Sequence, residues 1–128
     1  VAVLLFFVLC LLLVGIEKWR RQQVALAKLG NDPIMSKNLL GMRFIKQEIK
    51  VDDVIFNWKP SSPEVINYFE TKGDQREIFD RLIKFAQENG WKKRTIDTTG
   101  QPFYFSGTKS QTTLRIYIEN NKITIIRS

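Results

Sequence analysis

The sequence predicts an α+β protein: a single N-terminal transmembrane helix, followed by a small antiparallel sheet domain with one main packed helix. Three observations predict this fold class. Val1–Ile16 carries no charge, whereas all 20 Lys and Arg residues and all 13 Asp and Glu residues lie from Glu17 onward. An apolar stripe at helical spacing runs through residues 78–86. Beyond Gly90 the chain has the apolar–polar alternation typical of short strands.

The uncharged N-terminal segment predicts a retained membrane helix. Its 16 residues would rise by about 24 Å as a helix, somewhat short of a ~30 Å hydrocarbon core. Because the chain begins at Val1 rather than Met, we expect upstream residues to complete the span. A cleaved signal peptide is disfavoured, since the nearest small-residue triplet, Ala25-Leu26-Ala27, lies well beyond the apolar run. Acylation of Cys10 is disfavoured because Leu9 is bulky where a small residue is needed.

Basic and aromatic residues directly follow the apolar segment. Trp19 suits the membrane interface, and the Lys18 side chain is long enough to extend toward the headgroups. The predicted membrane-interface residues are Lys18, Trp19, Arg20 and Arg21. Positive charges beside a span resist translocation, so this flank predicts single-pass membrane localisation with a cytoplasmic soluble domain. Membrane lipid is therefore one expected partner.

We expect the first helix to continue beyond the membrane through Leu29. Gly30 is then the residue directly after the helix, where glycine is favoured. This divides the chain into an anchor helix with a juxtamembrane extension at residues 1–29, a linker at 30–41 and an α+β domain at 42–128.

The first half of the domain is expected to contain strands and one short helix. From Met42 the pattern becomes strand-like. The positions that alternate in period two are Val54, Phe56 and Trp58. Ser62-Pro63-Glu64 has the features of a helix start: a Ser cap, Pro at the first helical position and an acidic residue near the positive end of the helix dipole. We therefore expect a short helix from there to Gly73.

The main helix is predicted at residues 75–89. Asp74-Gln75-Arg76-Glu77 resembles a capping box, and Gly90 ends the helix. The apolar stripe between them consists of Ile78, Phe79, Leu82, Ile83 and Ala86. This spacing predicts a helix that packs one face on the sheet, with Leu82 in the core.

Four strands are predicted after this helix, at residues 91–97, 103–106, 112–119 and 122–127. Asn120-Asn121 suits a tight hairpin between the last two, because Asn tolerates positive φ. In the third strand, apolar Leu114, Ile116 and Ile118 alternate with Arg115 and Tyr117. The alternation predicts one buried and one solvated face of an antiparallel sheet.

The residues that usually carry catalysis are scarce. The chain has no His, the commonest general base and transition-metal ligand, and its single Cys lies in the apolar segment. No phosphate-binding loop or dinucleotide fingerprint is present. Asp52-Asp53 fits a turn better than a cation site, since adjacent residues of a strand point to opposite faces. We therefore expect a protein that is not an enzyme and has no cofactor.

Basic and aromatic residues of the predicted sheet are the best binding candidates. They are Lys92, Lys93, Arg94, Phe103, Tyr104, Phe105, Arg115 and Tyr117. We select Tyr104, Arg115 and Tyr117 as candidate protein-binding residues, because Tyr and Arg are enriched at binding hot spots. The net charge of +7 also suits anionic partners. A membrane-tethered nucleic-acid-binding module is therefore an alternative, in which the same aromatic side chains stack on bases.

The expected function is that of a non-catalytic single-pass membrane subunit that binds or stabilises other proteins of a larger membrane-associated assembly. A domain held near the membrane gains effective concentration for neighbouring membrane subunits. The layout is also similar to that of pilin-like and secretion-apparatus subunits, which pair an N-terminal apolar helix with a small sheet domain. It departs from pilins in one respect: Val1–Ile16 contains no Glu of the kind that pilin assembly normally uses.

Overall fold

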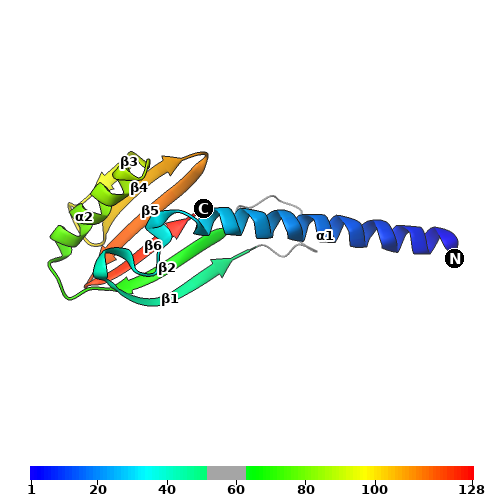
Figure 1. Ribbon diagram of the computed structural model, residues 1–128, viewed down its shortest axis with the longest axis horizontal. Coiled ribbons are helices and arrows are strands. Elements are labelled where there is room, and N and C mark those ends of the chain that lie inside the picture. Colours follow the sequence, from blue (N-terminus) through cyan, green and yellow to red (C-terminus); the bar gives the residue numbers. More distant parts are fainter. Residues whose placement is uncertain (52–62) are drawn as a thin grey trace.

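The computed structural model describes residues 1–51 and 63–128. Its elements, in chain order, are α1 (Ala2–Gly30), the 3-10 turns η1 (Pro33–Met35) and η2 (Leu39–Gly41), β1 (Arg43–Lys50), β2 (Glu64–Glu70), α2 (Gln75–Glu88), β3 (Lys92–Asp97), β4 (Phe103–Lys109), β5 (Thr112–Glu119) and β6 (Lys122–Arg127). The expected class is confirmed: a long apolar helix leads into an antiparallel sheet with a second helix packed on it (Figure 1). The expected turn at residues 52–53 and the alternation at 54–58 lie outside the described residues.

The strands form one sheet of six strands in the order β1-β2-β6-β5-β4-β3. Every neighbouring pair is antiparallel. The predicted hairpin between β5 and β6 is confirmed, with Asn120 at φ 52° and Asn121 at φ 63°. Two positive φ values in succession are typical of the turn that matches the twist of paired strands, and Asn adopts them more readily than most residues do.

The main helix α2 begins and ends as the sequence predicts. The Asp74 carboxylate accepts a hydrogen bond from the Arg76 backbone N–H at 3.1 Å, which caps the helix. Gly90 follows the helix at φ 93°, a conformation that strains other residues. Leu82 on α2 and Ile116 on β5 are both fully buried, as expected, so α2 covers the sheet through its apolar stripe.

The short helix expected after Ser62 is wrong, because residues 64–70 form the strand β2. The capping pattern at Pro63 is a local signal, whereas β2 is hydrogen-bonded to β1 on one side and β6 on the other. Val65 and Ile66 point to opposite faces and are both buried. β-branched and aromatic residues favour such a position, and the two sets of ladder hydrogen bonds outweigh a helix cap.

Residues 30–41, which the sequence marks as a linker, supply side chains to the hydrophobic core. Ile34, Met35 and Leu39 are all buried there together with the α2 stripe. Gly30 is the last residue of α1 rather than the first one after it, and Asn31 follows in a helical conformation. The helix therefore continues directly into packed turns, which place α1 against the sheet.

Candidate functional site

The first candidate region is the N-terminal part of α1. This helix is long and apolar enough to cross a membrane, properties that signal sequences share. Lys18, Trp19, Arg20 and Arg21 are all exposed on it. The Glu17 carboxylate lies 3.6 Å from the Arg20 guanidinium and 3.4 Å from that of Arg21. Exposed pairs of this kind contribute little stability, so these arginines remain available to anionic headgroups.

The second region is the sheet face opposite the helices, which we call the open face. Residues directly across an antiparallel ladder point to the same side. Tyr104 lies opposite Tyr117, and their ring centroids are 5.0 Å apart. The register continues this row across all six strands, through Lys46, Tyr68, Thr124, Tyr117, Tyr104 and Asp97. A row with three tyrosines therefore crosses the open face.

Several charged side chains on the open face form ion pairs with one another. Arg115 lies on the same face as the two tyrosines, and its guanidinium donates to Glu64 at 3.0 Å. Lys46 pairs with Glu48 at 3.0 Å, and the Tyr68 hydroxyl donates to the same carboxylate at 3.1 Å. Hydrogen bonds from Lys46 and Tyr68 lower the pKa of Glu48 from its ordinary value. The open face thus combines aromatic rings with several paired charges.

Most of the other basic and aromatic candidates lie elsewhere, but Lys92 lies across the ladder from Thr108, a residue of this face, at the opposite end of β3 from the position paired with Tyr104. Phe105 is fully buried on the helix-covered side, and Phe103 packs there against Phe79 with ring centroids 5.6 Å apart. Lys92, Lys93 and Arg94 are exposed on the edge strand β3. Positive charges on an edge discourage pairing with other strands. The structure therefore brings Tyr104, Arg115 and Tyr117 together, while the basic run at 92–94 begins at the opposite end of β3 from the position paired with Tyr104.

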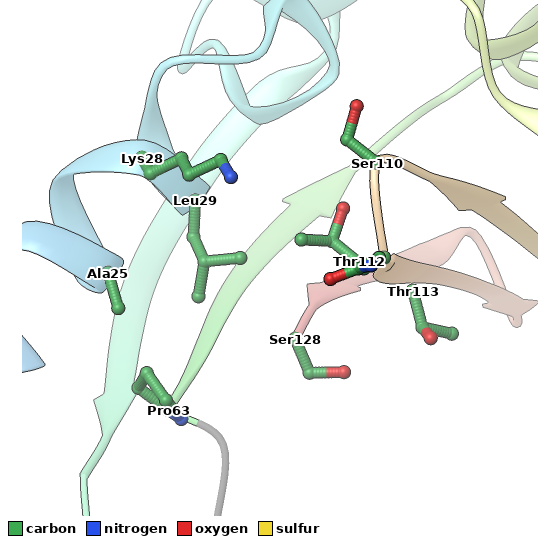
Figure 2. A pocket seen from close by; sticks show the side chains of 9 residues that line it. Ala25, Lys28, Leu29, Pro63, Ser110, Thr112, Thr113 and Ser128 are labelled. Atoms are coloured by element: carbon green, nitrogen blue, oxygen red, sulfur yellow. The ribbon is translucent and has the colours of Figure 1, made fainter.

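Two shallow depressions accompany these surfaces. One of about 380 Å³ borders the tyrosine row and is lined by Ile45, Lys46, Tyr68, Phe69, Glu70, Lys122, Ile123 and Thr124. The other, of about 330 Å³, lies between the end of α1 and the β4–β5 turn. Figure 2 shows Ala25, Lys28 and Leu29 of α1 on one side of it and Ser110, Thr112 and Thr113 on the other.

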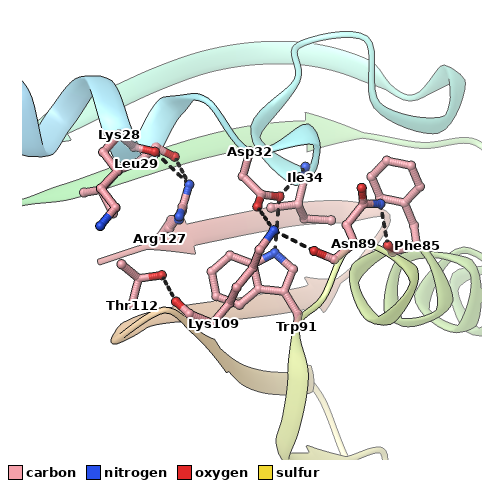
Figure 3. Close-up of polar contacts among 10 residues, drawn as sticks. All are labelled: Lys28, Leu29, Asp32, Ile34, Phe85, Asn89, Trp91, Lys109, Thr112 and Arg127. Atoms are coloured by element: carbon pink, nitrogen blue, oxygen red, sulfur yellow. Dashed lines mark hydrogen bonds and ion pairs between the residues drawn. The ribbon is translucent and has the colours of Figure 1, made fainter.

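The third region, which the sequence did not single out, is the junction between α1 and the sheet (Figure 3). Asp32, just beyond α1, is buried. Its carboxylate lies 2.6 Å from the Lys109 ammonium and accepts hydrogen bonds from the Ile34 backbone N–H at 3.1 Å and the Trp91 indole N–H at 3.2 Å. Burial alone raises the pKa of Asp32, but these hydrogen bonds outweigh it and hold the pKa below its ordinary value.

Arg127 completes the junction from β6. Its guanidinium donates to the Lys28 carbonyl at 3.0 Å and the Leu29 carbonyl at 2.8 Å, which are among the last carbonyls of α1. A cation there also complements the negative end of the helix dipole. The Trp91 ring is close to both cations, 5.2 Å from the Arg127 guanidinium and 5.7 Å from the Lys109 ammonium. Four chain segments therefore meet at one polar cluster, which we call the junction cluster: Asp32, Trp91, Lys109 and Arg127.

Within the parts of the chain that the structure describes, no group of three His, Cys, Asp or Glu residues is placed to hold a metal ion. Comparison of the whole chain with protein-family models, curated proteins and solved structures finds no match.

Proposed function

We propose that this chain is a non-catalytic, single-pass membrane subunit that binds and stabilises other proteins of a larger membrane-associated assembly through its open face. One observation carries the proposal. The apolar helix α1 runs without a break into the sheet domain, where Leu29 is buried in the core. A domain attached in this way holds the open face, with its half-buried tyrosines, at a set position beside the membrane.

The same continuity supports a retained anchor rather than a cleaved signal sequence. Leu26 packs against the core, and the carbonyls of Lys28 and Leu29 accept hydrogen bonds from Arg127. The end of the apolar helix is thus part of the folded domain, whereas a signal peptide is removed from the mature protein. The basic residues at 18–21 favour a cytoplasmic domain by the positive-inside rule.

The composition of the open face supports a protein partner. Tyr and Arg are enriched at protein interfaces, where rigid aromatic rings supply contact area at low entropic cost. Tyr104 and Tyr117 are both half-buried, so their rings are held in place before any partner binds. The ion pair between Arg115 and Glu64 lies beside them, as a polar rim lies beside an interface core.

The charge distribution argues against nucleic acid as the partner. Phosphate binding needs cations that are free to replace counterions. On the open face, the Arg115 guanidinium is held by the Glu64 carboxylate at 3.0 Å in a part-buried ion pair, so this cation is not free in that sense. A pilin-like or secretion-apparatus structural subunit is the second candidate, favoured by the 29-residue length of the single helix α1.

Purification in a mild non-ionic detergent tests the proposal. We expect a membrane protein to co-purify with the full chain and to be lost from the Tyr104→Ser, Tyr117→Ser double variant. The control is Arg81→Ser, an exposed change on α2, which should retain the partner. Retention should vary little between low and moderate salt, because few net charges are neutralised on binding. Recovery of a free monomer alone, from membranes that contain the native partners, would count against the proposal.

A further inference from the structure

We infer that the open face is directed along the plane of the membrane, and that the protein it binds is anchored in the same membrane. This inference rests on the proposed function and specifies the class of partner. It comes from the way α1 is attached to the sheet, which sets both the direction and the height of the open face relative to the bilayer.

The attachment begins along one side of α1. Between residues 21 and 30, the helix has four buried or half-buried residues: Gln22, Ala25, Leu26 and Leu29. The other residues of this stretch are exposed. The spacing of the four places them on one side of the helix. This stripe packs α1 against the domain, with contacts concentrated on β2.

The junction cluster then fixes the end of the helix. Arg127 on β6 holds two α1 carbonyls. Asp32, two residues after α1, is held by Lys109 on β4 and by Trp91 before β3. Swinging α1 away from the sheet would expose a buried carboxylate and break these charge-assisted hydrogen bonds together. The helix and the sheet therefore move as one unit.

The direction of the open face follows from where α1 lies. Figure 1 shows the sheet broadside, with α1 leaving it lengthwise, close to the direction of β1 and β2. The contacts of Asn67 and Arg127 with residues 28–35 put the chain after α1 on the helix-covered side of the sheet. The open face therefore points away from α1 and roughly perpendicular to its axis. When α1 crosses a bilayer, that direction lies along the membrane plane.

The height of the domain follows from the length of α1. Ala25 in the packed stripe lies nine positions after Ile16, the last residue of the apolar run, which is a rise of about 14 Å. The headgroup layer adds only about 5–8 Å on each side of the hydrocarbon core. Lipid therefore does not reach the open face. A protein anchored in the same membrane stands beside the helix at this height, and the shared membrane raises its effective concentration at the open face.

Site-specific photo-crosslinking in intact membranes tests this inference. The photoreactive residue p-benzoylphenylalanine replaces Tyr117 on the open face, and Arg81 on α2 in a matched control. A second pair of chains carries seven added residues, Ala-Ala-Gln-Ala-Ala-Gln-Ala, between Arg21 and Gln22. This insertion lifts the domain by about 10 Å and rotates it by only about 20° relative to the anchor, and it leaves the stripe and the junction cluster intact.

The inference predicts an adduct from position 117 with a protein that carbonate does not release from the membrane. The insertion should lower its yield severalfold, because the two anchored surfaces no longer meet at one height. Three results would overturn the inference: an adduct with a lipid, an adduct with a protein that carbonate releases from the membrane, or an adduct whose yield the insertion leaves unchanged. An adduct yield at position 117 no higher than at position 81 instead contradicts the proposed protein-binding function itself.

Discussion

The buried ion pair of the junction cluster gives the sharpest stability prediction. Lys109→Met removes the ammonium that lies 2.6 Å from the Asp32 carboxylate and 2.6 Å from the Asn89 carbonyl. The Asp32 side chain is only 4% exposed, and among the described residues it keeps the Ile34 N–H and the Trp91 indole N–H as donors. Removing one partner of a fully buried ion pair costs about 3–5 kcal/mol. Lys109 is 31% exposed, so water screens part of the loss, and we expect about 2–3 kcal/mol.

A double-mutant cycle separates the ion pair from simple loss of packing. Asp32→Asn removes the charge and keeps an oxygen that can accept from Ile34 and Trp91. We expect the double variant with Lys109→Met to be more stable than the sum of the single changes predicts, by about 1–3 kcal/mol. Urea unfolding in a non-ionic detergent, followed by tryptophan fluorescence, measures all four chains. A loss below about 0.5 kcal/mol for Lys109→Met would refute the account of the cluster.

The same ion pair sets a pH dependence with a definite sign. The pKa of Asp32 is lower in the folded state than its ordinary value, because Lys109 and the two N–H donors favour the carboxylate. Its stabilising contribution is complete above the ordinary pKa of about 4 and is lost as the pH falls toward the lower folded pKa. The unmodified chain should therefore lose more stability between pH 5 and about pH 3 than Asp32→Asn does.

Two further predictions concern the core and the anchor. Leu82→Ala and Ile116→Ala should each lower the free energy of unfolding by about 2–5 kcal/mol, because both side chains are fully buried. The control Lys84→Ala, at an exposed position on α2, should change the free energy of unfolding by less than about 0.5 kcal/mol. Similar losses at all three positions would contradict the assigned faces. Mass spectrometry of the chain isolated from cells should detect residues 1–30, and this chain should stay in the membrane after carbonate extraction. A chain that is cut near Ala27 and released by carbonate would identify α1 as a signal sequence.

The sequence predicts most elements that depend on local patterns. The α2 helix follows from the Asp74 cap, the Leu82 stripe and Gly90, and the β5–β6 hairpin follows from Asn120-Asn121. The division of β5 into buried Ile116 and half-exposed Tyr117 follows from alternation in period two. These signals lie within a few residues of the structure that they specify, so no long-range contact is needed to interpret them.

What the sequence does not reveal depends on contacts between distant residues. β2 carries a helix-start signal at Pro63, yet it becomes a strand because β1 and β6 lie on either side of it. Its β-branched pair Val65-Ile66 is the signal that favoured the strand. Asp32 and Lys109 are separated by 77 positions. Lys109 lies between two predicted strands, at 103–106 and 112–119, so the sequence predicts that it is in a loop. The sole local sign of the junction is Asp before Pro33, a common start for a helical turn.

The placement of the open face rests on α1 and the sheet moving as one unit, and a distance measurement between them tests this claim most directly. Cys10 is the sole Cys, so Cys10→Ser leaves a background for spin labels at Gln23→Cys on α1 and Lys122→Cys on β6, both exposed sites. Pulsed electron–electron double resonance in lipid nanodiscs should give a single narrow distance distribution. A control with a six-residue Gly-Ser linker after Gly30 should broaden it. A distribution in the unmodified chain as broad as that of the control would contradict the account.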